Sequence, residues 1–91
     1  MEFGKIGQEV GKLVADKQQA YGDSFGRAGA CLREMFPAGI QPHQYDDLLT
    51  IARILDKLFR IANDPHAFSE NPYQDIAGYG LLGMRRHDEN K

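Results

Sequence analysis

Cysteine and long apolar runs are both scarce in this chain of 91 residues. Its single cysteine, Cys31, excludes a disulfide within the chain, and so low a cysteine content favours an intracellular compartment. Because Cys31 sits in a half-apolar stretch of helical character, the sequence predicts a packing residue rather than a nucleophile. The opening residues, MEFGKIGQEVGKL, contain no continuous apolar run, so we expect neither a signal peptide nor a membrane span. These absences predict a cytoplasmic protein without a membrane partner.

Positive charge is not in excess, and several catalytic motifs are missing. The chain has 11 Lys and Arg residues against 13 Asp and Glu residues, a formal net charge of −2. Proteins that bind duplex nucleic acid normally carry a strong positive excess, so we expect no duplex partner. No glycine-rich phosphate loop follows a strand, and no G-x-S-x-G motif occurs. The three histidines are dispersed without ligand spacing, which argues against a zinc site.

The residues that are present predict an all-α fold, a compact bundle of about four helices that forms one domain over residues 1–91. We expect helices over residues 3–20, 25–35, 42–62 and 72–86, and no segment has the pattern of a strand. The helix over 42–62 is apolar over most of its circumference, so it should lie at the centre. Residues 87–91 are charged and predict a disordered tail. Because so short a domain has a thin core, we expect a homo-oligomer, with a ligand site between chains.

Capping residues mark the expected helix ends. Gly22 suits a left-handed cap after the first helix, and Asp23-Ser24 suits the start of the second. Pro42 and the pair Asn71-Pro72 are typical of helix starts, because proline lacks the N–H that would be unpaired there. The first helix carries an apolar face at intervals of three and four residues, which consists of Phe3, Ile6, Val10, Leu13 and Val14.

Two features near the first helix stand apart from simple patterning. Lys17 continues the apolar face, and it is either a phosphate or carboxylate ligand at the rim of a pocket or a lysine whose stem extends to solvent. The segment Tyr21-Gly22-Asp23-Ser24-Phe25 joins two helices. It is either an anion site, built from free backbone N–H groups and a hydroxyl, or a plain helix cap.

Two further features lie on the third and fourth helices. A charged face of the third helix consists of Arg53, Asp56, Lys57 and Arg60 at spacings of three and four. It is either a cleft for an anionic ligand or a solvated face with internal ion pairs. Glu70 comes just before the fourth helix, and Asp75 and Tyr79 continue along one side of that helix. Its two carboxylates either bind Mg²⁺ or stabilise the positive end of the helix dipole.

Three segments in order, KQQAYGDSF (residues 17–25), RILDKLFRI (53–61) and ENPYQDIAGYGLL (70–82), resemble the nucleotide modification associated domain, which is found largely in phage proteins. That family is similar in turn to the all-helical nucleotide pyrophosphohydrolases, the group that includes MazG and the dimeric dUTPases. The resemblance implies a helical, often oligomeric protein with a nucleotide or cyclic nucleotide ligand. If the chain is phage-encoded, its compartment is the host cytoplasm.

The resemblance assigns roles to residues that match the motifs. The residues expected to bind the ligand are Lys17, Tyr21, Asp23, Ser24, Arg53, Lys57, Arg60 and Tyr79, with the cations on phosphate and a tyrosine on the base. The residues expected to hold Mg²⁺ are Asp56, Glu70 and Asp75.

The chain departs from the pyrophosphohydrolases in one respect. It contains no Glu-x-x-Glu, whereas those enzymes hold Mg²⁺ with clustered carboxylates, which phosphoryl chemistry needs to fix the metal and orient water. Three interpretations stay open: a protein that binds or sequesters a nucleotide or nucleotide-derived signal without turnover, a Mg²⁺-dependent nucleotide pyrophosphohydrolase, and a helical protein-interaction module.

Overall fold

The computed structural model describes residues 2–90, and every regular element among them is helical. In chain order these are α1 (Phe3–Tyr21), α2 (Ser24–Met35), the 3₁₀ turn η1 (Pro42–Gln44), α3 (Tyr45–Asn63), the 3₁₀ turn η2 (Ala67–Ser69) and α4 (Pro72–Glu89). The expected all-α class with four helices is therefore confirmed for this part of the chain. None of these helices combines the length and the apolar character that crossing a bilayer requires.

The helix boundaries follow from the capping residues. Gly22 ends α1 in the left-handed conformation, with φ of 59°. Asp23 begins α2, and its side chain accepts a hydrogen bond of 3.1 Å from the backbone N–H three residues further on. Asn71 begins α4, where its side-chain oxygen accepts from the backbone N–H groups of Tyr73 and Gln74. The caps expected at these three positions are confirmed.

The carboxyl end of α4 differs from the expected one. The helix continues to Glu89, so residues 87–89, expected in a disordered tail, are helical, while Lys91 lies outside the described residues. Two contacts lie in the last turns of α4. The Arg86 guanidinium donates to the Thr50 hydroxyl of α3 at 3.2 Å, and Arg85 pairs with Glu89 one turn later at 3.7 Å. The Thr50 contact thus fastens the end of the predicted helix to α3, and the charged composition of residues 87–89 does not end α4.

The connections on either side of α3 also differ in detail from the prediction. Pro42 begins the short turn η1, and the α-helix itself begins at Tyr45. The polar loop after α3 contains η2, in which Phe68 and Ser69 adopt left-handed conformations with φ of 59° and 55°. Non-glycine residues rarely hold such conformations unless tertiary contacts impose them. The path of this loop is therefore set by its contacts rather than by local preference.

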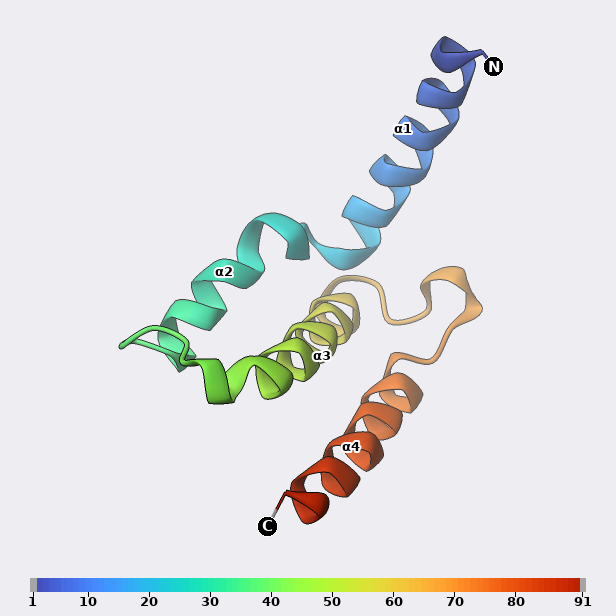
Figure 1. The fold of residues 1–91 in the computed structure, drawn as a ribbon. Helices are drawn as coiled ribbons and strands as arrows, with labels where there is room; N and C mark the ends of the chain where they lie inside the picture. The colour runs from blue at the N-terminus through green and yellow to red at the C-terminus, as the bar shows by residue number, and fades with distance from the viewer. Residues whose placement is uncertain (1, 91) are drawn as a thin grey trace.

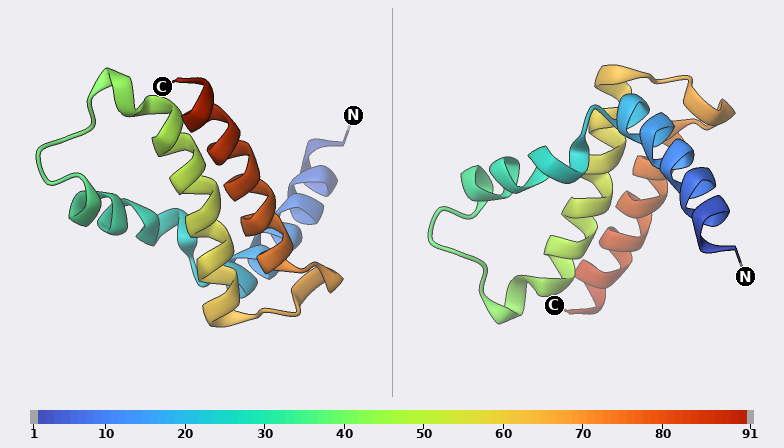
Figure 2. Two further views of the ribbon diagram at one scale, coloured as in Figure 1. Left: turned by 90° about the horizontal axis from the view of Figure 1, so that it is seen from below. Right: turned by 90° about the horizontal axis from the view of Figure 1, so that it is seen from above.

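Helix α3 lies at the centre and contacts α1, α2 and α4, as its apolar circumference predicts. It runs antiparallel to α4, while α2 and the amino-terminal half of α1 diverge from this pair (Figure 1, Figure 2). The radius of gyration is 16.1 Å, whereas a compact domain of this length would have about 12 Å. The bundle is thus open, and the described helices leave much apolar surface uncovered.

Few side chains are buried, and they gather around the middle and end of α3. Among residues 2–90 the buried ones are Ala20, Ser24, Leu55, Arg60 and Pro72. They come from the corner between α1 and α2, from α3, and from the first residue of α4. Two of the five are polar, so the apolar core of the single chain is as thin as its length predicts.

Candidate functional site

A pocket of about 610 Å³ opens between the second half of α1, the start of α2, the middle of α3 and one residue of α4. Its volume falls within the range of about 300–1,000 Å³ that is typical of small-molecule sites. Six of the eight residues that the sequence predicts to bind a ligand line this pocket, which we call the cationic pocket: Lys17, Tyr21, Ser24, Arg53, Lys57 and Tyr79. The fold therefore brings together most of a set that is dispersed along the chain.

Three cationic side chains line the pocket, from two different helices. Lys17 comes from α1, while Arg53 and Lys57 lie one turn apart on α3 and so share a face. The Arg53 guanidinium lies 5.9 Å from the centre of the Tyr79 ring, and the Lys57 ammonium lies 5.9 Å from the centre of the Tyr21 ring. Cation–π contacts thus associate each of the two α3 cations with an aromatic ring of the pocket.

The three cations differ in their partners. Lys57 forms an ion pair with Asp75 of α4, at 3.2 Å. Lys17 and Arg53 take part in no ion pair within residues 2–90, and both side chains are exposed. The Lys17 ammonium lies 5.3 Å from the centre of the Phe68 ring instead. The pocket therefore presents two cations that form no ion pair within residues 2–90, together with the carboxylate of Asp56, which lines the same pocket.

Lys57 is held in its charged form. Partial burial lowers the pKa of Lys57, but the hydrogen bond with Asp75 and the interaction with Tyr21 raise it by more. The pKa of Lys57 therefore lies above its ordinary value, because the ion pair favours the charged form.

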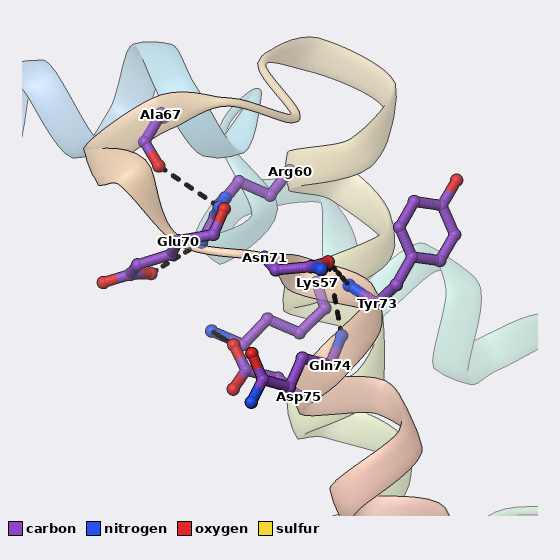
Figure 3. A network of polar contacts seen from close by, with 8 residues as sticks. All are labelled: Lys57, Arg60, Ala67, Glu70, Asn71, Tyr73, Gln74 and Asp75. Carbon is purple, nitrogen blue, oxygen red and sulfur yellow. Dashed lines mark hydrogen bonds and ion pairs between the residues drawn. The ribbon is translucent and has the colours of Figure 1, made fainter.

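Arg60 lies outside the cationic pocket, although the sequence groups it with the ligand-binding cations. Its guanidinium is fully buried and donates to the Glu70 carboxylate at 2.6 Å, to the Glu70 carbonyl at 2.8 Å and to the Ala67 carbonyl at 3.2 Å (Figure 3). Its Nε atom has no hydrogen-bond partner. Arg60 thus fastens the loop of η2 to α3, because that loop folds back over the last turn of the helix.

Asp23 is also absent from the pocket lining. Its carboxylate caps α2 and accepts a further hydrogen bond of 2.9 Å from the Gln18 side-chain amide. Of the two alternatives for this junction, the structure shows the helix cap for Asp23. Ser24, the next residue, is buried and does line the pocket.

The three carboxylates expected to hold Mg²⁺ lie apart. Asp56 lines the cationic pocket, whereas Glu70 and Asp75 line a second hollow of about 1,020 Å³ beside α4. Glu70 pairs with Arg60, and Asp75 pairs with Lys57 (Figure 3). Residues 2–90 contain no group of three or more His, Cys, Asp or Glu residues placed to hold a metal ion. The three carboxylates do not fit one Mg²⁺ ion in this arrangement, and Mg²⁺ binding by this set stays a prediction.

Four residues of the lining are not among those predicted to bind the ligand or a metal ion: Leu13, Val14, Gln18 and Phe25. Helical spacing contains the signal for three of them, Leu13, Val14 and Gln18. Leu13, Lys17 and Tyr21 follow one another at intervals of four, so they form one row on α1. Gln18 lies four residues after Val14 and three before Tyr21, in the neighbouring row. Once Lys17 and Tyr21 are assigned to a site, these neighbours belong to its wall.

Comparison with known proteins gives no relative: no family model, no curated protein and no solved structure matches this chain. The resemblance to the nucleotide modification associated domain therefore rests on the three sequence segments alone.

Proposed function

We propose that the chain binds or sequesters a nucleotide, or a nucleotide-derived signal, in the cationic pocket without hydrolysing it. The observation that carries the proposal is the pair Lys17 and Arg53, two unpaired cations that line the same pocket as Tyr21 and Tyr79. A nucleotide needs positive charge for its phosphates and a flat aromatic surface for its base. Both requirements are met within one pocket of suitable volume.

The binding residues have distinct roles in this proposal. The planar guanidinium of Arg53 can donate to two phosphate oxygens at once, and the Lys17 ammonium adds a point charge from α1. Lys57 contributes a third positive charge, which its Asp75 partner partly offsets. The rings of Tyr21 and Tyr79 already lie under cations at 5.9 Å, so a base that stacks there would lie beside the phosphate-binding groups.

The ion pairs beside the pocket support binding rather than turnover. Glu70 is engaged by the buried Arg60, and Asp75 is engaged by Lys57. Both carboxylates line a different hollow from Asp56, so their recruitment to one metal ion with Asp56 would require these side chains to move, and a movement that separated Glu70 from Arg60 would leave the buried guanidinium with an uncompensated charge. The pyrophosphohydrolase interpretation needs that rearrangement, whereas the binding interpretation does not.

A nucleotide panel separates the three interpretations. The protein is incubated with nucleoside mono-, di- and triphosphates and cyclic nucleotides, with and without Mg²⁺, and then resolved by chromatography. We expect a nucleotide that is retained by the protein and recovered intact. Release of a monophosphate and pyrophosphate would instead establish the hydrolase, and Asp75→Asn should then abolish that release. If the protein neither retains nor hydrolyses any nucleotide of the panel, the binding and hydrolase interpretations are both contradicted. The protein-interaction module is then the interpretation that is left.

A further inference from the structure

The amino-terminal half of α1 and the turn that follows it carry an apolar strip that the described chain leaves largely uncovered. We call Phe3, Ile6, Val10, Leu13 and Val14 the α1 strip. The exposed fractions are 77% for Phe3, 51% for Val10, 52% for Leu13 and 53% for Val14. Figure 1 shows this half of the helix pointing away from the other helices. An amphipathic helix normally buries its apolar face, so this face lacks its partner in the single chain.

The α1 strip continues into the wall of the cationic pocket. Leu13 and Val14 belong to both surfaces, and Phe25, also on the pocket wall, is 95% exposed. A large aromatic side chain that is almost wholly in water is unfavourable by about 1.5–3 kcal/mol relative to a buried one. A binding partner that lies along the α1 strip and over Phe25 would cover both surfaces and would close the open side of the pocket.

The charges around the strip indicate what kind of partner covers it. Between Glu2 and Lys17 the charged residues are balanced, with Glu2, Glu9 and Asp16 against Lys5, Lys12 and Lys17. A helix that lies on a membrane surface is typically rich in Lys and Arg on its polar face. A balanced helix instead lets two identical helices approach without net repulsion.

Two glycines on α1 leave room for a helix that approaches closely. A Cβ atom added at Gly7 or at Gly11 would meet no atom of the chain within 4 Å. Gly7 lies four residues after Phe3 and Gly11 lies three residues before Val14, so both glycines flank one edge of the strip. The backbone of a second helix can therefore come nearer here than bulky side chains would allow.

The uncovered area matches what a stable dimer needs. Together with Phe25, the α1 strip exposes on the order of 700 Å², if a full aromatic side chain presents about 150–250 Å². A standard protein interface buries about 800 Å² on each partner, so the strip and its flanking residues suffice. We infer that the α1 strip docks the same face of a second copy of this chain about a two-fold axis, and that the second copy closes the cationic pocket over Phe25. The inference does not depend on which ligand the pocket holds.

The mass of the protein in solution tests the docking. We expect light scattering at micromolar concentration to give twice the chain mass of 10.2 kDa for the wild type. Ile6→Glu with Val10→Glu places charge in the strip and should give the single-chain mass. The matched control, Gln8→Glu with Ala15→Glu, adds the same charge to the opposite face of α1 and should leave the dimer intact. Circular dichroism should show equal helicity for all three proteins.

The docking is overturned if light scattering gives the wild type the mass of a single chain at every concentration. It is also overturned if the variant with Ile6→Glu and Val10→Glu keeps the mass of two chains. Sedimentation of a monomeric wild type with anionic phospholipid vesicles would also overturn it, in favour of a lipid surface.

The closure of the pocket can be followed by the fluorescence of a tryptophan placed at position 25, because the chain contains no tryptophan of its own. In Phe25→Trp the indole is the single tryptophan, and we expect blue-shifted emission in the dimer. Dilution, or addition of Ile6→Glu and Val10→Glu, should move the emission to that of an indole in water. Water-like emission from a protein that is still dimeric would overturn the closure. No nucleotide is present in either experiment, so their failure and a failure of nucleotide binding are distinguishable.

Discussion

Arg60 of α3 and Glu70 at the end of η2 form an ion pair of 2.6 Å in which the guanidinium is fully buried and the carboxylate is half exposed. The same guanidinium also donates to the backbone carbonyls of Ala67 and Glu70. One side chain therefore fastens the loop that holds Phe68 and Ser69 in left-handed conformations. Because Phe68 contacts Lys17, this clamp also sets the environment of a cation in the candidate site.

Removal of the clamp should destabilise the fold. We expect Arg60→Met to lower the free energy of unfolding by about 2–4 kcal/mol, since two backbone carbonyls and a carboxylate lose a charged donor. Urea denaturation followed by circular dichroism measures the change. Arg53→Met is the matched control on the same helix, because Arg53 is exposed and unpaired, and it should change stability by less than about 0.5 kcal/mol. Equal losses in the two variants would contradict the clamp.

The unpaired cations of the pocket should matter for binding and not for folding. We expect Lys17→Ala and Arg53→Ala each to weaken binding of the retained nucleotide by about 1.5–3 kcal/mol, the range for charged hydrogen bonds. The melting temperature of the ligand-free protein should not fall. Isothermal titration calorimetry and thermal melting measure the two quantities on the same samples. Lys5→Ala, which removes a cation of α1 outside the pocket, should leave the affinity unchanged. A lower melting temperature with unchanged affinity would end the site assignment.

The corner between α1 and α2 should require glycine at position 22. Gly22 has φ of 59°, and a Cβ atom there would overlap the Asn63 side chain at the end of α3. We expect Gly22→Ala to lower the free energy of unfolding by about 1–3 kcal/mol, measured by urea denaturation. Gly39→Ala is the comparison, because Gly39 also has a positive φ of 89° but meets no neighbour within 4 Å. A loss at Gly22 no larger than the loss at Gly39 would show that the contact with Asn63 adds nothing.

The raised pKa of Lys57 predicts a contribution to stability that disappears in alkali. A raised folded-state pKa stabilises the fold below the unfolded-state pKa of about 10.4, and the contribution is lost as pH rises through the folded-state value. We expect the wild type to lose up to about 1 kcal/mol from this pair, because Asp75 is well exposed and the pair is screened.

Lys57→Arg supplies the control for that loss, because arginine stays charged throughout the alkaline range. Urea denaturation of both proteins between about pH 9 and pH 12 measures the difference, and other groups that titrate in that range cancel in the comparison. Parallel pH profiles for the two proteins would show that the Lys57–Asp75 pair does not contribute.

Local patterns were enough to predict the helices. Apolar spacing and the caps at Gly22, Asp23 and Asn71 depend on residues within about four positions, and the structure confirms each of them. The same spacing placed Arg53 and Lys57 on one face of the central helix. Where packing with a distant segment decides the outcome, local patterns were insufficient. The loop of η2 is such a case, since its return to α3 is fixed by the contacts of Glu70 and Ala67 with Arg60.

The division of the charged face of α3 was decided by tertiary structure. Spacing alone makes Arg53, Lys57 and Arg60 equivalent members of one row, and it cannot say which carboxylate reaches which cation. The return path of the loop after α3 brings Glu70 to Arg60 and Asp75 to Lys57, which leaves Arg53 unpaired in the pocket. The amino-acid sequence thus determined the helices and the residue types of the site. Only the tertiary contacts decided which charges are neutralised, because ion pairs between distant segments depend on where the chain returns.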